Sequence, residues 1–419
     1  MRAFSFRDLR AALDPRLIRV LAASLIGVTL SSADQSLFSY AIPDITREFR
    51  VGLEVIGQLL SLSFLVASFA VVACGMAADE WGRRVVFVAI ITLSALCVGL
   101  HALAPSLWLI GALRIVGFAL GAGVYPIANT LVLESAPLRY RGFLAGLLQI
   151  GYPLGFAVAS LLAAPLFAAY GWRAIFVAAF GVAALAPLLG RLLPADARAP
   201  AARTAARGSR PALARIGRLF YADLRSRSLL CLTGGFLVCF AIGATTYFLP
   251  TYLVQSHGLT PARASALVGG SYAIGVVGYL AASYVGEFVT TRRNTLILWI
   301  FAGAAVFAAT LWGAESESML LAGLGASVMF FYGTEAVRMP MIGELFPAEV
   351  RVTATAVTGS LAVTIAWIVC PLVVSALVPR LGWTLTLSWC VLAPLLLGGC
   401  VFLALINQPS GEASPAYAP

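Results

Sequence analysis

The stretch GMAADEWGRR, from Gly75 to Arg84, separates two long apolar segments of the chain. Two helices that cross a bilayer in opposite directions need a short polar turn between them, and this stretch has the composition of such a turn. Its glycines allow two helix ends to approach closely. Asp79 carries a carboxylate that a helix N-terminus favours, and the pair Arg83 and Arg84 predicts a turn on the cytoplasmic side. The stretch therefore predicts a helical membrane protein.

The composition also places the chain among multi-pass membrane proteins. Of its 419 residues, 61% are hydrophobic and 11% are charged, with a mean hydropathy of +0.94, whereas a soluble protein has about a quarter charged residues. The net charge is +10, and all 28 basic residues are arginine. Because arginine gathers in cytoplasmic loops of membrane proteins, this charge does not indicate nucleic-acid binding. The seven cysteines include no C-x-x-C pair, so no metal, disulfide or cofactor is expected.

Twelve apolar segments are long enough to cross a membrane, since a spanning helix needs about 20 apolar residues. An even number of spans after a basic N-terminus predicts that both chain ends are cytoplasmic, and the arginines concentrate in the loops which that topology places inside. We therefore expect a multi-pass protein of the bacterial inner membrane. The predicted spans begin near Leu17, Val55, Val85, Leu107, Phe143, Arg173, Leu229, Arg263, Thr295, Met319, Thr353 and Trp383.

The two halves of the chain repeat each other. Three short patterns occur once in each half, in the same order. The two copies of the Glu-x2-Pro-x3-Arg pattern lie 210 residues apart. This duplication predicts two six-helix units, residues 1–190 and 228–419, joined by a basic cytoplasmic linker at 191–227. The patterns are Glu134-x2-Pro137-x3-Arg141 and Glu344-x2-Pro347-x3-Arg351, Gly171-Trp172 and Gly382-Trp383, and Arg83-Arg84 and Arg292-Arg293.

The spacing G-x3-D-x2-G-R-R in the stretch from Gly75 to Arg84 resembles the signature loop between the second and third helices of the major facilitator superfamily. The resemblance implies an all-α membrane protein whose twelve transmembrane helices form two pseudo-symmetric six-helix bundles. Parallel repeats of this kind place the substrate site between the bundles, near the middle of the membrane. We expect two charge clusters to form a cytoplasmic gate, made of Asp79, Arg83, Arg84, Glu134, Arg141, Glu287, Arg292, Arg293, Glu344 and Arg351.

Four ionisable residues lie inside the predicted spans, where charges are costly and tend to be functional. Asp34 in the first span and Arg114 in the fourth lie at similar depths, so we expect them to face each other or the cavity. The alternative is an ion pair that only joins two helices. Glu335 and Arg338 share one helix face, as a proton-exchanging site, as an internal ion pair, or as part of the cytoplasmic charge network with Glu344. Asp34 and Glu335 are the candidate proton-coupling residues, and Arg114 and Arg338 are candidate substrate-binding residues.

Polar and aromatic residues at comparable depth complete the expected substrate site. A mainly apolar pocket with a few polar groups suits a small organic substrate, although core packing is the alternative for each aromatic side chain. Phe38, Tyr252 and Tyr332 also lie at this depth. The candidate substrate-binding residues are Tyr125, Asn129, Gln149, Tyr152, Tyr247 and Phe331.

The first span contains the stretch SSADQSLFSYAIPDI with Asp34, and the fourth contains the stretch RIVGFALGAGVYP, which begins with Arg114. These stretches resemble two groups of the superfamily, the aromatic acid/proton symporters and the anion/cation symporters. The resemblance implies that Asp34 takes part in proton coupling or substrate binding and that Arg114 fills the arginine position. Gln35 and Val124 depart from an arginine and an acid that are usual in relatives, which shifts the expected proton coupling onto Asp34 and Glu335.

The expected function is proton-coupled symport of a small organic anion, a carboxylate or an aromatic acid, by alternating access. The alternative is a proton-coupled efflux antiporter of drugs or metabolites, because Gly151-Tyr152-Pro153-x-Gly155 is similar to the drug antiporter motif. A third class is a non-transporting sensor with the same fold. The sequence contains no nucleophile elbow, metal-ligand cluster or phosphate loop, so an enzyme is not expected. The expected partners are the substrate, protons and the lipid bilayer, and the chain is expected to be a monomer.

Overall fold

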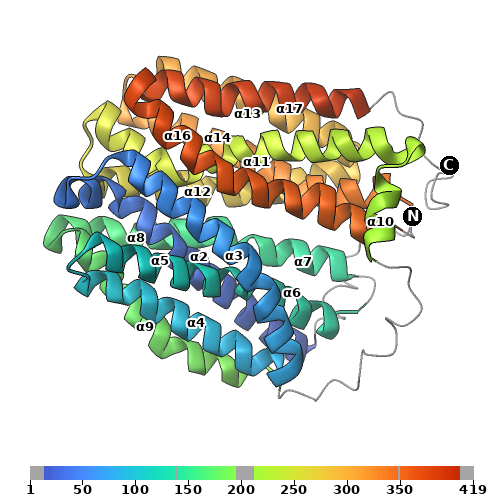
Figure 1. Cartoon of the computed structure of the whole chain (residues 1–419), viewed down its shortest axis with the longest axis horizontal. Helices are drawn as coiled ribbons and strands as arrows, with labels where there is room; N and C mark the ends of the chain where they lie inside the picture. Colours follow the sequence, from blue (N-terminus) through green and yellow to red (C-terminus); the bar gives the residue numbers. More distant parts are fainter. Residues whose placement is uncertain (1–13, 138–139, 195–211, 348–349, 406–419) are drawn as a thin grey trace.

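The computed structural model describes residues 14–137, 140–194, 212–347 and 350–405, and every regular element in these ranges is helical. Figure 1 shows the two halves of the chain as two bundles that lie side by side. The first half forms α2 (Pro15–Phe49), α3 (Leu53–Trp81), α4 (Arg83–Leu100), η1 (His101–Leu103), α5 (Leu107–Ala122), α6 (Val124–Ser135), α7 (Arg141–Gln149), α8 (Gly151–Tyr170) and α9 (Trp172–Leu192). The second half forms α10 (Ala212–Leu219), α11 (Ala222–His257), α12 (Pro261–Tyr284), η4 (Val285–Val289), α13 (Arg292–Gly313), α14 (Glu317–Leu345), α15 (Arg351–Ala354), η5 (Thr355–Leu361), α16 (Ala362–Leu387), η6 (Ser388–Leu392) and α17 (Ala393–Ala404).

The described helices provide the twelve apolar spans that the sequence predicts. Eleven continuous helical segments are long and apolar enough to cross a membrane, and the last of them, Thr355–Ala404, has 50 residues. Gly382, which lies inside α16, interrupts this segment with a φ of 74°, and the part of α16 that precedes it runs opposite to α17 (Figure 1). Gly171, its counterpart in the first half, has a φ of 78° between α8 and α9. Glycine adopts this backbone conformation without strain, which explains the glycine of the Gly-Trp pair in each half.

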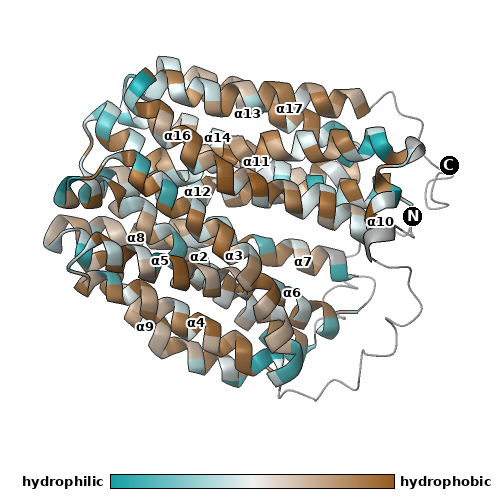
Figure 2. Cartoon of the chain, viewed as in Figure 1, coloured by the Kyte–Doolittle hydropathy of each residue, from teal (hydrophilic) through white to brown (hydrophobic). Residues whose placement is uncertain are grey.

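Most of the hydrophilic residues lie at the two ends of the long helices, and the helix shafts are mainly apolar (Figure 2). We call the end that holds the α3–α4 turn at Gly82 and α10 the basic end. The other end, which holds Arg50, Gly171 and Gly258 at helix termini, is the opposite end. The expected linker, residues 191–227, falls partly on residues 195–211, which lie outside the described residues; α10 lies in the rest of it.

The two bundles contact each other mainly where α3 packs on α16 and where α8 packs on α12, and α2 also meets α11. Ser61 Oγ donates a hydrogen bond to the carbonyl oxygen of Ile368 at 2.6 Å, and Ser160 Oγ donates to the carbonyl oxygen of Ser265. Small residues allow this close approach, because a Cβ on Gly57 would collide with α16. These contacts lie in the halves of the helices next to the opposite end. The structure is therefore closed at that end.

Candidate functional site

Arg114 lies on α5 with its side chain buried, 3% exposed. Its Nη1 donates a hydrogen bond to the backbone carbonyl oxygen of Gln35 at 3.0 Å. Its Cζ lies 4.8 Å from the ring centroid of Phe38 and 4.6 Å from that of Phe118. Among the described residues, Nε and Nη2 have no hydrogen-bond partner. Because a buried donor without an acceptor is costly, Arg114 is an incomplete site that a carboxylate would complete with charge-assisted hydrogen bonds.

Five aromatic side chains form what we call the aromatic box; three of them lie around this guanidinium, and the other two pack on those three. The ring of Phe64 on α3 lies 4.7 Å from that of Phe118, 5.4 Å from that of Tyr247 on α11 and 5.2 Å from that of Trp367 on α16, between centroids. Tyr247 and Trp367 contact each other at 5.6 Å. Helices α3 and α5 belong to one bundle and α11 and α16 to the other, so the box joins both bundles. Its members are Phe38, Phe64, Phe118, Tyr247 and Trp367.

Asp34 does not pair with Arg114, which corrects the expectation drawn from their similar depths. The Asp34 side chain is buried, 2% exposed, and its Oδ2 has no hydrogen-bond partner in the described part of the chain. Arg114 instead meets α2 at Gln35 and Phe38. Phe38 follows Asp34 by about one helical turn, so the two residues share a face of α2, and the guanidinium approaches that face at Phe38 and not at the Asp34 carboxylate. A similar depth along the axis is therefore not sufficient to bring the two charges together.

Glu335 and Arg338 form an ion pair within α14. Arg338 Nε donates to Glu335 Oε1 at 2.9 Å, and Nη2 donates to Oε2 at 2.6 Å. The Arg338 side chain is fully buried, while that of Glu335 is 27% exposed. Cys239 Sγ on α11 lies 3.5 Å from Glu335 Oε1. This geometry realises the internal pair that the sequence allowed, and it leaves one edge of the carboxylate accessible.

The other expected residues divide between the interior of the site and the bundle cores. Tyr125 and Tyr152 contact each other with 5.5 Å between ring centroids, and both lie within electrostatic range of Tyr279 on α12 across the interface between the bundles, as does Glu335 from within the second bundle. Asn129 has a buried Oδ1 without a partner among the described residues, and Gln149 is half-buried at the end of α7. Phe331 packs on Phe307 of α13 at 5.7 Å, inside its own bundle.

The expected gate residues form two similar clusters at the basic end, one in each bundle. Arg83 pairs with Asp79 at 3.5 Å and also with Glu134. Arg292 pairs with Glu287 and with Glu344. Arg141 donates to the carbonyl oxygen of its own bundle's Ala136 at 3.2 Å. Each of these interactions stays within one bundle, and the remaining expected members are Arg84, Arg293 and Arg351.

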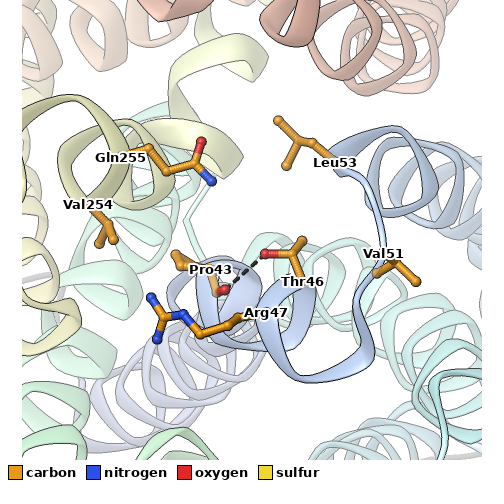
Figure 3. A pocket seen from close by; sticks show the side chains of 7 residues that line it. All are labelled: Pro43, Thr46, Arg47, Val51, Leu53, Val254 and Gln255. Atoms are coloured by element: carbon orange, nitrogen blue, oxygen red, sulfur yellow. Dashed lines mark hydrogen bonds between the residues drawn. The ribbon is translucent and has the colours of Figure 1, made fainter.

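A pocket of about 280 Å³ opens at the opposite end, between α2, α3 and α11. Figure 3 shows Arg47 and Gln255 on facing sides of it, with Thr46 Oγ1 donating to the carbonyl oxygen of Pro43 at 2.9 Å. Arg47 already pairs with Asp44 at 3.0 Å, and Gln255 Oε1 accepts from the indole of Trp383 at 2.9 Å. The charged and polar groups of this pocket have protein partners, unlike Nε and Nη2 of Arg114.

Sequence reasoning missed three members of the aromatic box and a buried histidine, His101. Phe118 follows Arg114 by four residues, so the helical spacing that brings i and i+4 together was a usable signal. Phe64 and Trp367 come from helices far apart in the chain and carry no such signal. His101 is 1% exposed, and its ring lies 6.1 Å from that of Phe38 between centroids.

Comparison with known proteins agrees with this arrangement. The family model described as Major Facilitator Superfamily matches residues 24–334. The chain is 30% identical over 338 residues to the cis,cis-muconate transport protein of Acinetobacter baylyi, covering 79% of this chain and 80% of that protein. It is 26% identical over 362 residues to the gallate transporter of Pseudomonas putida, covering 80% of each.

A solved structure supports the fold. The crystal structure of a bacterial homolog to the human lysosomal transporter Spinster, in an inward-facing and occupied conformation, matches with a TM-score of 0.74. The match covers 96% of this chain and 100% of that one at 16% sequence identity. At this identity the likeness concerns the helical architecture alone.

Proposed function

Because the chain belongs to the major facilitator superfamily, we propose that it is a secondary transporter that carries a small organic anion across the membrane together with a proton. The superfamily comprises transporters and not enzymes, as the sequence led us to expect. The chain is a multi-pass membrane protein related to transporters whose names denote carboxylates, cis,cis-muconate and gallate. The substrate class and the coupling to protons are the proposed part.

The observation that supports this proposal is that two nitrogen atoms of the Arg114 guanidinium lack hydrogen-bond acceptors. Nε and Nη2 are buried without acceptors among the described residues, and a carboxylate accepts two parallel hydrogen bonds from such a fork. The rings of Phe38 and Phe118 flank the guanidinium and offer apolar surface to the body of the substrate. Tyr125, Asn129, Gln149, Tyr152 and Tyr247 are the proposed further contacts. Phe331 packs on Phe307 of α13, so its proposed effect on substrate binding is indirect, through the shape of the C-terminal bundle.

Asp34 is the proposed principal proton site, with Glu335 as the second candidate. A carboxylate that is buried in the membrane interior without an arginine partner is a functional group by default, and Asp34 has this environment. Glu335 is partly exposed but bound to Arg338 by two hydrogen bonds, so protonating it requires that pair to loosen. Arg338 would then offer a second guanidinium to an anion.

Efflux of cationic drugs is the alternative function, and the site argues against it. A cation that entered the aromatic box would meet the positive charge of Arg114 within the same ring of side chains. Two positive charges that are buried together repel each other unless an anion lies between or beside them. The box therefore favours an anionic substrate.

We propose that the two bundles, α2–α9 and α11–α17, move as units, and that the basic end faces the cytoplasm as the positive-inside rule predicts. The two gate clusters would then meet when the basic end closes and separate when it opens. Their interactions within single bundles, together with inter-bundle contacts near the opposite end, support an inward-open state for this structure.

Uptake into proteoliposomes tests the proposed function. The purified protein is reconstituted, a pH gradient is imposed or omitted, and aromatic and aliphatic acids are screened for accumulation. We expect at least one carboxylate to accumulate only with the gradient. Uptake is also measured for the variant Arg114→Ala. Its matched control is Arg263→Gln, since Arg263 is 68% exposed at the opposite end and pairs with Glu317. Accumulation of organic cations in exchange for protons, with no carboxylate transported, would contradict the proposal.

A further inference from the structure

His101 is buried at the end of α4 and presents one ring nitrogen without a partner. Its Nδ1 lies 2.8 Å from the carbonyl oxygen of Cys97. A carbonyl oxygen only accepts hydrogen bonds, so Nδ1 carries the proton of the neutral ring and Nε2 carries a lone pair. Nε2 is buried and has no hydrogen-bond partner in the described part of the chain. A buried acceptor left without a donor requires an explanation.

The ring of His101 connects to the substrate site through one phenylalanine. It stacks on Phe176 of α9 with 5.0 Å between centroids and an interplanar angle of 22°. The ring of Phe38 lies 6.1 Å from it between centroids, with an interplanar angle of 73°. The same Phe38 ring lies 4.8 Å from the guanidinium carbon of Arg114. His101 is thus one aromatic ring away from the proposed substrate anchor.

The charged surroundings of His101 are simple. Arg114 on α5 lies within electrostatic range of the ring, and α2 and α9 present the apolar rings of Phe38 and Phe176. Its own helix presents the titratable thiol of Cys97, four residues earlier. On the far side, Arg173 donates to the carbonyl oxygen of Ala104 at 3.3 Å and pairs with Glu48 at 2.6 Å, so these two charges offset each other.

We propose that His101 is a further proton site beside Asp34, which binds a proton when the substrate anion occupies Arg114 and is needed with Asp34 for proton-coupled transport. This inference rests on the proposed function and adds a residue to it. Burial is the main cost of a positive charge on the imidazole, and the positive charge of Arg114 adds to that cost. A substrate carboxylate on Arg114 offsets the charge of Arg114 and removes the added repulsion, so the anion and the proton each strengthen the binding of the other. The proton from solution adds at Nε2 to give an imidazolium, and its release on the other side restores the neutral ring.

A purely structural role of His101 predicts a different result from proton binding. Two substitutions of His101 distinguish these two roles. His101→Asn keeps a short side chain with an amide donor for the Cys97 carbonyl but removes the titratable nitrogen. His101→Phe keeps the stack on Phe176 and removes both nitrogens. His257→Asn is the control, because His257 Nε2 already lies 2.9 Å from the Tyr252 hydroxyl. Transport is measured as pH-gradient-driven accumulation and as counterflow exchange, which needs no net proton movement.

We expect both His101 variants to lose gradient-driven accumulation and substrate-induced proton uptake while counterflow continues, with His257→Asn behaving like the unmodified protein. Accumulation that persists in His101→Asn would overturn the inference. Failure of the proposed function is distinguishable, because the unmodified protein itself would then show no response to the gradient.

A second measurement needs no change at His101. The chain has two histidines, so His257→Asn leaves His101 as the single histidine of a protein purified without a histidine tag. In ¹⁵N-histidine NMR with cis,cis-muconate as the probe, and with gallate in a parallel sample, the Nε2 signal should move toward its protonated position when the probe binds. A bound probe, shown by its own signals, that leaves Nε2 unprotonated would refute the inference.

Discussion

Tyr247 on α11 lies over Arg114 on α5, with 5.9 Å between the ring centroid and the guanidinium carbon. The two residues belong to different bundles and to halves of the chain that repeat each other. A substrate held by Arg114, as we propose, would therefore touch both of the bundles that are proposed to move relative to each other during transport. This gives the anion a means to favour one arrangement of the bundles over another, because a ligand shifts a conformational equilibrium only through contacts that differ between the states.

Arg114→Ala should weaken substrate binding strongly. The lost charge-assisted hydrogen bonds are worth about 2 kcal/mol, or about thirtyfold in affinity, and more if both donors are used. Arg114→Lys should recover only part of the affinity, because an ammonium lacks the planar fork. Equilibrium binding of a transported acid to detergent-solubilised protein measures the effect, with Arg263→Gln as the control. Unchanged affinity in Arg114→Ala would place the anion elsewhere.

Asp34→Asn mimics the protonated carboxyl group and should abolish accumulation driven by a pH gradient, while counterflow exchange stays largely intact. The physical reason is that a side chain which cannot release its proton cannot carry one in each cycle. Asp44→Asn is the matched control, because Asp44 lies at the opposite end of the same helix and pairs with Arg47. If Asp34→Asn still accumulates substrate in response to the gradient, Glu335→Gln becomes the variant to test.

Asp79→Asn should shift the population toward the state that is open at the basic end. Asp79 is 74% exposed, so the shift should not exceed about 1 kcal/mol, or about fivefold in population. Spin labels at Gly146 on α7 and Gly343 on α14 report the distance between the bundles, since a Cβ at either position meets nothing within 4 Å. The exposed Cys400 is replaced beforehand. An unaltered distance distribution would make the cluster structural.

Gly57→Ala should shift the same distance distribution in the other direction. The added methyl group would collide with Ser375 and the Pro371 carbonyl oxygen on α16, and overpacking of this kind costs about 1–3 kcal/mol. Closure at the opposite end is therefore disfavoured, and the labels at the basic end should come closer together. Gly181→Ala is the control, because its Cβ meets no atom within 4 Å. Equal distributions for the two variants would show that the α3–α16 contact does not limit closure.

Much of the fold follows from local properties of the sequence. Hydropathy and length predict the twelve spans, and the repeated Gly-Trp pairs mark Gly171 and Gly382, which have matching backbone conformations. The resemblance of the stretch from Gly75 to Arg84 likewise identifies the family. These features depend on residues close together in the chain, which is why a single sequence reveals them.

The site is only partly predictable, because it depends on which groups the long side chains reach. Counting residues from a helix end gives the depth of Asp34 and Arg114, and their depths suggested a pair. The Arg114 guanidinium instead meets the backbone carbonyl oxygen of Gln35 and the ring of Phe38, one turn along α2 from Asp34. Phe64 and Trp367 reach the box from α3 and α16, through packing between the bundles that no local pattern encodes.

The measurement that tests the central claim most directly compares the binding of a transported carboxylic acid with that of its uncharged methyl ester, in the unmodified protein and in Arg114→Ala. If Arg114 anchors the anion, the acid binds the unmodified protein much more tightly than the ester, and the substitution removes that difference. Equal binding of acid and ester to the unmodified protein, or a preference for the acid that survives in Arg114→Ala, would contradict the claim.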